Sequence, residues 1–308
     1  MLKNSYKFKP FLDFSQASGY TNSAMKILIL GAQGNLGTQL VKTFKDYEVL
    51  AWDRNEVDLL DFTNLSSKLE LASPDIVINA AAYNAVDKCE ELEEEKALAI
   101  KLNTDLPDLL SSWCQQNNKI LVQYSTDYVF SGYDDKKEFS EVDAPNPINV
   151  YGQSKFGGEV AVNSSGANYY LIRVSKLFGP PGKSEYSKKS FFDIMLDLAS
   201  RNLELKVVDE ELSCFTYTPD LATATKELVE NKQPYGIYHL INEGAVTWYE
   251  GVLELKKIAG FSAEIKAVSG DFMPRPAKRP KFSVLQNTKA PHLRPYQAAL
   301  KEYLQNKQ

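Results

Sequence analysis

Histidine and cysteine are scarce in this sequence, and their scarcity excludes several kinds of site. The 308 residues include two histidines, His239 and His292, and three widely separated cysteines, Cys89, Cys114 and Cys214. Two histidines cannot form a His-rich metal cluster, and neither accompanies a nucleophile-elbow sequence that would complete a Ser-His-Asp triad. An odd number of distant cysteines indicates reduced, packed thiols in a cytoplasmic protein. We therefore expect no metal and no disulfide framework.

Basic excess and long apolar runs are also missing. Lysine and arginine total 35 against 40 acidic residues, a net charge of −5, so we expect neither a nucleic-acid nor a membrane partner. No apolar run approaches the roughly 18 residues of a membrane span. Residues 1–24 lack the apolar core and cleavage site of a secretory signal, which predicts a flexible extension ahead of the fold.

Three glycines follow the first apolar run of the chain. Residues 25–30 predict a strand buried on both faces, which leads into a helix through Gly31, Gly34 and Gly37. A second apolar run ends at Asp53. Glycines permit a tight turn, a helix N-terminus attracts a pyrophosphate, and an acid about 20 residues on accepts hydrogen bonds from a ribose. This order predicts a dinucleotide site; the alternative is a plain tight turn without a ligand.

The alternation of strands and helices continues along the chain. Residues 75–79 and 120–124 predict two further strands, and the alanine run 80–82 either leaves room for a cofactor or allows close packing. The later strand delivers Thr126 and Asp127 to the carboxyl edge of the sheet, where ligands collect. We therefore predict an α/β fold, a doubly wound parallel sheet of Rossmann type with a smaller C-terminal substrate lobe. The expected parts are the extension 1–24, a dinucleotide-binding domain of 25–165 plus about 200–240, and a substrate-binding lobe of about 166–200 and 241–308.

A tyrosine and a lysine four residues apart begin a later helix. Tyr151 and Lys155 share one helix face, with Cβ atoms about 5–6 Å apart. One positive charge about 4 Å from a phenol contributes about 4 kcal/mol at an effective dielectric of about 20, which would bring the tyrosine pKa from about 10 to about 7. We therefore predict that Lys155 lowers the pKa of Tyr151 in a dry site beside a cofactor. The same spacing occurs twice more, at Tyr133 with Lys137 and at Tyr303 with Lys307.

Together these motifs resemble the extended short-chain dehydrogenase/reductases and, more narrowly, the dTDP-4-dehydrorhamnose reductase family. The resemblance covers residues 25 to about 304. Three segments carry most of it: Asn-Ala-Ala-Ala-Tyr-Asn-Ala-Val-Asp-Lys at 79–88, Tyr-Ser-Thr-Asp-Tyr-Val-Phe at 124–130 and Asn-Val-Tyr-Gly-Gln-Ser-Lys at 149–155. Arg279-Pro280 with Ser283 and Leu285 matches the C-terminal pattern of that family.

The resemblance implies hydride transfer from NADPH or NADH to the C4 ketone of dTDP-4-dehydro-L-rhamnose. Tyr151 would protonate the nascent alkoxide, Lys155 would lower the Tyr151 pKa and hold the nicotinamide ribose, and Thr126 would hydrogen-bond the ketone oxygen. Asp127 and Lys176 would meet the sugar nucleotide. The remaining cofactor contacts that the resemblance implies are Gly31, Gly34, Asn35, Leu36 and Gly37 near the pyrophosphate, Asp53 at the ribose, Asp61 and Phe62 beside the adenine, and Ala82, Tyr83, Asn84 and Tyr124 along the cofactor.

The sequence departs from the family pattern on the substrate side. Lys176 stands where the family usually has a tryptophan that stacks on the substrate. In segment 210–216, Glu211, Ser213 and Phe215 replace Gln, Gly and Pro of the family pattern, which implies a different loop path. These changes leave Thr126, Tyr151 and Lys155 intact, so they weaken the inference about the substrate more than the inference about the chemistry.

Several alternatives stay open at this point. The chain could reduce another nucleoside-diphosphate 4-ketosugar, or be a non-catalytic regulatory subunit similar to the methionine adenosyltransferase beta subunit. Asp53 favours NADH, whereas Arg54 could accept the 2′-phosphate of NADPH. The basic, proline-rich segment 273–280 is either a rigid surface loop or a place where Arg275, Lys278 or Arg279 meets a diphosphate. A homodimer is also left open.

Overall fold

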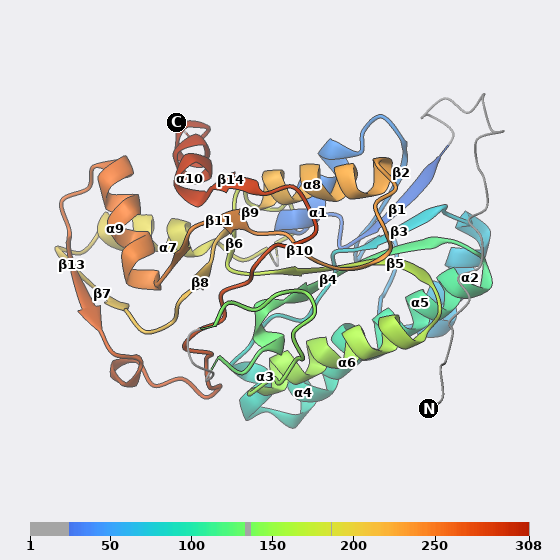
Figure 1. Ribbon diagram of the computed structural model, residues 1–308, viewed down its shortest axis with the longest axis horizontal. Helices are drawn as coiled ribbons and strands as arrows, with labels where there is room; N and C mark the ends of the chain where they lie inside the picture. Colours follow the sequence, from blue (N-terminus) through green and yellow to red (C-terminus); the bar gives the residue numbers. More distant parts are fainter. Residues whose placement is uncertain (1–24, 133–136, 186, 308) are drawn as a thin grey trace, which may run out of the picture.

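A six-stranded parallel sheet forms the centre of the protein (Figure 1). The computed structural model describes residues 25–132, 137–185 and 187–307; the expected extension 1–24 and Tyr133 of one Tyr–Lys pair lie outside the described residues. The strands lie in the order β2-β1-β3-β4-β5-β10. Their bounds are β1 (Lys26–Leu30), β2 (Glu48–Trp52), β3 (Ile76–Asn79), β4 (Ile120–Thr126), β5 (Asn168–Val174) and β10 (Gly236–His239).

The direction of the connections reverses between β1 and β3. From β1 the chain moves outward to β2, then crosses back to β3 and continues through β4 and β5 on the other side. Ligands of open α/β sheets bind outside the carboxyl ends of the strands at such a switch point. The sheet topology therefore places the residues after β1 and after β3 at the expected binding crevice.

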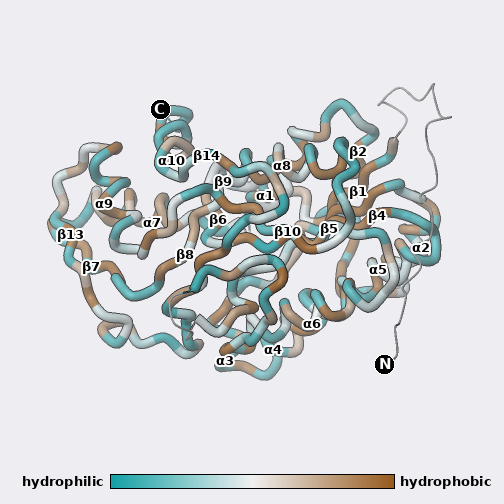
Figure 2. The backbone as a smooth tube through the Cα atoms, in the orientation of Figure 1, coloured by the Kyte–Doolittle hydropathy of each residue, from teal (hydrophilic) through white to brown (hydrophobic). Residues whose placement is uncertain are grey.

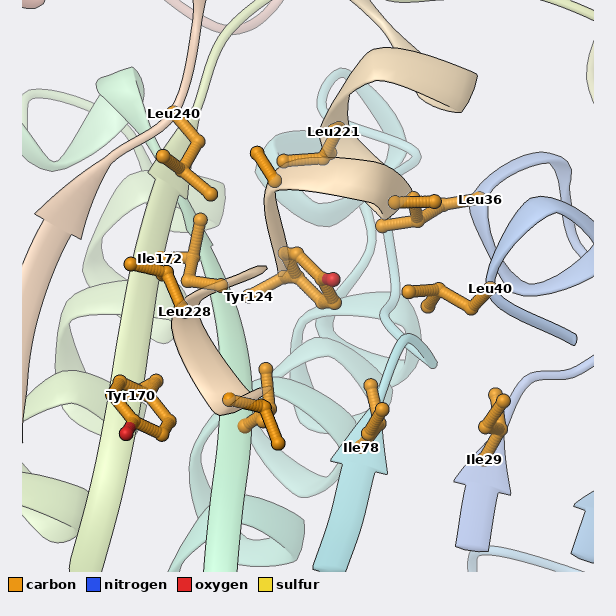
Figure 3. Close-up of a cluster of buried hydrophobic side chains, with 14 of the residues drawn as sticks. Ile29, Leu36, Leu40, Ile78, Tyr124, Tyr170, Ile172, Leu221, Leu228 and Leu240 are labelled. Carbon is orange, nitrogen blue, oxygen red and sulfur yellow. The ribbon is translucent and has the colours of Figure 1, made fainter. Parts of the chain in front are cut away.

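Two helical layers cover the sheet because successive strand residues point to opposite faces. Ile27 and Ile29 belong to a first core cluster with residues of α1 (Asn35–Thr43) and α8 (Thr218–Glu230). Leu28 and Leu30 belong to a second core cluster with residues of α2 (Phe62–Ala72), α5 (Leu106–Gln116) and α6 (Val150–Ser164). Figure 2 shows the hydrophobic colouring along these central strands, and Figure 3 shows part of the first cluster. The helices of the two layers are α1 (Asn35–Thr43), α2 (Phe62–Ala72), α3 (Lys88–Glu91), α4 (Glu93–Ile100), α5 (Leu106–Gln116), α6 (Val150–Ser164) and α8 (Thr218–Glu230).

A π turn at Lys101–Asp105 joins α4 to α5 and faces α6. Its Asn103 is buried, and the side chain both accepts from the Tyr83 amide at 3.0 Å and donates to the Tyr83 carbonyl at 2.9 Å. It also donates to Ser154 Oγ at 3.0 Å. Turns of this type often occur at functional sites, and this one joins the segment after β3 to the helix that carries Tyr151.

A smaller lobe, at the left of Figure 1, is built from short strand pairs and three helices around an aromatic core. Phe178, Phe192 and Phe215 pack there with edge and tilted contacts, which aromatic rings prefer to face-to-face stacking. The pairs are β6 (Leu177–Phe178) with β9 (Thr216–Tyr217), β7 (Glu204–Val208) with β13 (Glu264–Val268), β8 (Ser213–Cys214) with β12 (Ala245–Val246), and β11 (Asn242–Glu243) with β14 (Leu293–Pro295); the helices are α7 (Phe191–Ala199), α9 (Trp248–Ala259) and α10 (Tyr296–Gln305).

Two strands belong to a different part of the protein from the one predicted for them. β5, expected in the substrate-binding lobe, lies inside the central sheet between β4 and β10. β7, expected in the dinucleotide-binding domain, pairs with β13 in the smaller lobe. The correction has a simple cause. β5 has buried apolar side chains on both faces and extends the sheet, while Glu204 and Lys206 of β7 face solvent and suit a two-stranded pair. Within the described residues, no helix has the length and apolar character needed to cross a membrane.

Candidate active site

The glycine turn after β1 has the geometry that a dinucleotide requires. Gly31 has φ +71°, a left-handed conformation that favours glycine. A Cβ on Gly37 would lie 2.0 Å from the Gly31 carbonyl oxygen, so only glycine allows α1 to start this close to the turn. Asp53, at the end of β2, accepts a hydrogen bond from the Gln33 amide at 2.9 Å. The structure therefore brings Asp53 to the glycine turn.

Several features of the crevice fit a bound nicotinamide dinucleotide. Gly34 is the N-cap residue of α1 and, within the described chain, no side chain caps this helix, so its first amides stay available for an anion. A Cβ on Gly31 would lie 2.9 Å from the Ala81 amide nitrogen, so the small residues after β3 lie directly beside the turn. Ser125 Oγ is buried at the carboxyl edge without a hydrogen-bond partner in the described part of the chain.

The segment after β3 is held in place by its neighbours. Asn103 fixes the backbone of Tyr83, whose hydroxyl donates to Glu95 Oε2 at 2.7 Å. Burial, together with this carboxylate, raises the pKa of Tyr83. The Asn84 carbonyl accepts a hydrogen bond from Lys188 at 3.2 Å. The residues expected along the cofactor, from Ala82 to Asn84, thus form an ordered wall of the crevice.

Asp61, Phe62 and Tyr124 have structural roles in the fold. Asp61 caps α2 by accepting from the Asn64 amide at 3.0 Å. The Phe62 ring packs against the second core layer with Lys101 5.3 Å from its centroid. The Tyr124 side chain points under α8 into the first cluster, where its hydroxyl lies 2.7 Å from Thr225 Oγ1 (Figure 3). Tyr124 therefore reaches the site through its backbone.

Thr126 and Tyr151 meet at the carboxyl edge of β4. Thr126 Oγ1 donates to Asp127 Oδ1 at 3.2 Å and accepts from the Tyr128 amide at 3.2 Å, which fixes the hydroxyl. Burial raises the pKa of Tyr151, and hydrogen bonding with the Thr126 side chain lowers it. The Tyr151 ring contacts the cluster that contains Tyr83, so the side chain adjoins the wall beside the glycine turn.

Asn149 determines where the helix of Tyr151 begins. It is the N-cap residue of α6, and its Oδ1 accepts from the Gly152 amide at 2.7 Å. A side chain at Gly152 would meet the Tyr128 carbonyl oxygen, because a Cβ there would lie 2.2 Å from it. The cap and the close approach together position Tyr151 at the first turn of the helix, facing the end of β4.

The pKa of Tyr151 shifts upward in the structure, and not downward as predicted. The Lys155 ammonium is buried and donates to the Tyr124 carbonyl oxygen at 2.7 Å. Burial lowers the pKa of Lys155 to about 8, and Glu159 opposes this shift. The net pKa shift of Tyr151 is upward because burial of its phenol is the largest contribution. The prediction of an acidic phenol is therefore wrong for this structure, since desolvation outweighs the nearby groups.

The substrate side of the crevice is a buried, charged cluster. Asp127 accepts from Ser283 Oγ at 2.6 Å, and burial raises its pKa. Lys176, at φ +37°, donates to the carbonyls of Glu211 and Val246 at 3.0 and 3.1 Å. Its ammonium lies 4.2 Å from the Trp248 ring centroid, and burial lowers its pKa to about 8. Lys176 and Asp127 were predicted from the sequence, whereas Trp248 was not, because no local motif indicates it. Ser283 belongs to the C-terminal pattern of the family, but its contact with Asp127 was not predicted.

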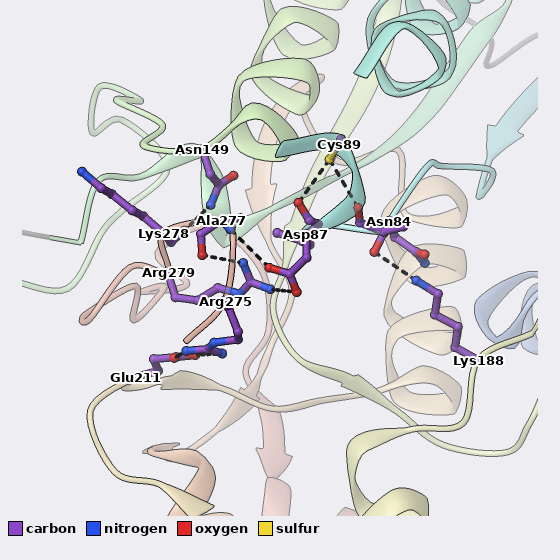
Figure 4. Close-up of polar contacts among 12 residues, drawn as sticks. Asn84, Asp87, Cys89, Asn149, Lys188, Glu211, Arg275, Ala277, Lys278 and Arg279 are labelled. Carbon is purple, nitrogen blue, oxygen red and sulfur yellow. Dashed lines mark hydrogen bonds and ion pairs between the residues drawn. The ribbon is translucent and has the colours of Figure 1, made fainter. Parts of the chain in front are cut away.

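The segment 273–280 is tied down by ion pairs (Figure 4). Arg275 pairs with Glu211, and Arg279 pairs with Asp87 at 2.8 Å. Asn149 donates to the Lys278 carbonyl at 2.8 Å. These contacts match the rigid-loop alternative of the sequence analysis, because the carboxylates already neutralise both arginines.

Comparisons with known proteins identify the family. The family described as "RmlD substrate binding domain" matches residues 25–308. The chain belongs to this family. The spore coat polysaccharide biosynthesis protein SpsK of Bacillus subtilis is 34% identical over 92% of this chain and 98% of its own length.

Solved structures of this reductase family have the same fold. A dTDP-4-dehydrorhamnose reductase from Clostridium acetobutylicum has a TM-score of 0.85 and 34% identity, over 92% of this chain and 99% of its own. The Bacillus anthracis dTDP-4-dehydrorhamnose reductase, determined in complex with NADP, has a TM-score of 0.84 and 28% identity, over 92% and 99%. The predicted Rossmann-type fold and the predicted family are thus confirmed.

Proposed function

We propose that this chain is an NAD(P)H-dependent reductase that converts dTDP-4-dehydro-L-rhamnose to dTDP-L-rhamnose. One observation carries the proposal: Tyr151 and Thr126 interact at the carboxyl edge of β4, next to the wall that adjoins the glycine turn. A crevice with this arrangement can hold a nicotinamide, a ketone and a proton donor together. The names of the relatives agree with this chemistry.

The backbone of the glycine turn and the first amides of α1 would hold the diphosphate of the cofactor. Asp53 would accept hydrogen bonds from the adenosine ribose. When bound, the cofactor supplies the hydride. Thr126 would orient the C4 ketone by donating to its oxygen, and Asp127 would face the sugar. The buried cluster around Lys176 and Trp248 would exclude water from the reacting carbon.

Tyr151 would give its hydroxyl proton to the C4 oxygen as that oxygen becomes an alkoxide. The raised pKa keeps the phenol protonated at neutral pH, which is the form that a general acid needs. An alkoxide is a stronger base than a phenolate, so the transfer is favourable even from a weakly acidic tyrosine. The buried Lys155 ammonium would stabilise the phenolate left behind and hold the nicotinamide ribose.

The test is the consumption of NADPH or NADH with dTDP-4-dehydro-L-rhamnose, followed by the absorbance of the reduced nicotinamide. We expect turnover with the wild type and its loss with Tyr151→Phe. Turnover that survives this change would remove Tyr151 as the acid. Cofactor binding without any turnover, together with a stable protein partner in pull-downs, would instead support a regulatory subunit.

The cluster around Lys176 favours one second candidate, a reductase of another nucleoside-diphosphate 4-ketosugar. An ammonium over Trp248 occupies the place where the family usually presents a stacking tryptophan. A panel of dTDP-, UDP- and GDP-linked 4-ketosugars, compared by kcat/KM, separates the two candidates. The division into a dinucleotide-binding and a substrate-binding lobe, a cytoplasmic location and a homodimer remain parts of the proposal.

A further inference from the structure

The loop between β6 and α7 lies on the glycine turn. The Gly182 amide donates to Asn35 Oδ1 at 2.9 Å, and the Lys183 amide donates to the Gln33 carbonyl at 2.8 Å. A Cβ on Gly182 would lie 2.4 Å from the Gln33 carbonyl oxygen, so the two backbones are in direct contact. Part of the smaller lobe thus reaches the start of α1 and borders the cofactor crevice.

Lys188, six residues further on, spans the switch point of the sheet. Its carbonyl oxygen accepts from Asn35 Nδ2 at 2.9 Å, and its ammonium donates to the Asn84 carbonyl at 3.2 Å (Figure 4). Asn35 follows β1 and Asn84 follows β3, and these two strands are neighbours in the sheet. One residue therefore bridges the two sides of the crevice between the strand ends.

The charge of Lys188 lacks a matching carboxylate. Within the described ranges its ammonium forms no ion pair, and its one hydrogen bond is to the neutral carbonyl of Asn84. Burial and the nearby Lys88 lower the pKa of Lys188, an effect that Asp87 opposes. The next residue, Lys189, forms an ion pair with Asp197 on α7 and provides a contrast. Lys188 is an exposed residue, so an anion can reach its ammonium beside a second lysine and the uncapped start of α1.

We propose that Lys188 binds the diphosphate of the nicotinamide cofactor. This inference rests on the proposed function, because it uses the same crevice. A sugar nucleotide also carries a diphosphate, but its expected contacts, Asp127 and Lys176, follow β4 and β5, whereas both anchors of Lys188 lie at β1 and β3. The Lys188 ammonium would exchange the Asn84 carbonyl for a phosphate oxygen, a charge-assisted hydrogen bond.

Titration of the full chain with NADPH, followed by nicotinamide fluorescence or calorimetry, tests the proposal without turnover. We expect Lys188→Ala and Lys188→Gln to raise the NADPH Kd about tenfold, Lys188→Arg to stay within about threefold of the wild type, and the matched control Lys189→Ala to leave the Kd unchanged. The loss in the two neutral variants should shrink at high salt, because an ionic contact is screened. Circular dichroism verifies that each variant is folded.

Three results would overturn the assignment. Lys188→Ala and Lys188→Gln could bind NADPH as tightly as the wild type, Lys189→Ala could lose as much affinity as Lys188→Ala, or the loss could appear only in a parallel titration with dTDP. A wild type that binds NADPH but reduces no 4-ketosugar would refute the proposed function and leave the assignment of Lys188 intact. A wild type that does not bind NADPH would refute both proposals.

Discussion

Two tyrosine–lysine pairs with identical spacing occupy different surroundings in this protein. On α10, the Tyr303 hydroxyl donates to Asp193 at 2.7 Å, and Lys307 forms an ion pair with the same carboxylate. On α6, Tyr151 and Lys155 share no carboxylate among the described residues: the phenol interacts with the Thr126 side chain, and the ammonium donates to the Tyr124 carbonyl. The α10 pair ties the C-terminal helix to α7, whereas we propose that the Tyr151 phenol of the α6 pair donates its proton to the substrate. The surroundings, and not the spacing, decide the chemistry.

The largest difference between the pairs should appear in turnover. We expect Tyr151→Phe to lower kcat about 10²–10⁴-fold, because it removes the proton donor while the cofactor crevice stays intact. Tyr303→Phe is the matched control, with the same change at the same spacing, and its kcat should stay near that of the wild type. Equal losses in both variants would show that folding, and not proton donation, was affected.

A buried ion pair next to Lys155 stabilises the helix that carries the α6 pair, and a substitution can remove it. Arg173 is fully buried and binds Glu159 through two hydrogen bonds of 2.9 and 2.7 Å, one helical turn beyond Lys155. Glu159→Ala should lower the free energy of unfolding by about 3–5 kcal/mol, because it leaves a buried guanidinium without its partner. Urea unfolding measures the loss.

The double variant Glu159→Met with Arg173→Met provides the control for this loss. It removes both charges and should be clearly more stable than Glu159→Ala alone. A double variant as unstable as the single one would show that packing, and not charge, explains the effect.

A third difference should depend on pH. The Lys155 pKa is lowered from 10.5 to about 8 in the folded chain, so holding the charged form below pH 8 costs about 3 kcal/mol of folding free energy. Between pH 8 and 10.5 the unfolded chain binds more protons at this residue than the folded chain, so the wild type gains stability relative to Lys155→Met. Urea unfolding of both proteins from pH 8 to 10.5 measures the difference between their free energies of unfolding. We expect this difference to change by about 3 kcal/mol across the window. A difference that stays constant would contradict the lowered pKa of Lys155.

The smallest effect is expected at the α10 pair. Burial raises the pKa of Asp193, but hydrogen bonds from Lys307, Tyr303 and Ser190 outweigh it and hold the pKa below the usual 3.8. This carboxylate therefore stabilises the fold above its unfolded pKa, and the contribution disappears as the pH falls below about 4. Asp193→Asn should cost about 1–2 kcal/mol at pH 7 and less at pH 3, because the contribution decreases as the pH falls toward the lowered pKa of Asp193. A loss that persists undiminished at pH 3 would contradict this role.

The sequence predicted the parts of the site that depend on local order. Gly31, Gly37 and Asp53 lie close together because a strand, a tight turn, a helix and a second, neighbouring strand follow one another in the chain. Tyr151 and Thr126 meet because α6 starts at the edge where β4 ends. These relations follow from neighbouring elements, so periodicity and glycine spacing were sufficient.

The pKa values and hydrogen-bond partners of the site residues could not be predicted from the order of the elements. The pKa of Tyr151 depends on how deeply its phenol is buried, and the hydrogen bond of Lys155 to a backbone carbonyl has no sequence signal. Asn103 reaches Tyr83 only because of a π turn, which the residue pattern does not indicate. The apolar side chains in 168–174 are the sequence signal that could place β5 in the sheet.

The hydrogen bond between Ser283 and Asp127 joins residues 156 positions apart. A ribosome that has made the glycine turn, β4 and α6 has still to synthesise more than a third of the chain before this contact can form. Under the proposed role of Asp127, recognition of the sugar would be among the last properties that a newly made molecule acquires. We expect a growing chain to assemble its nucleotide crevice well before it can distinguish one ketose from another.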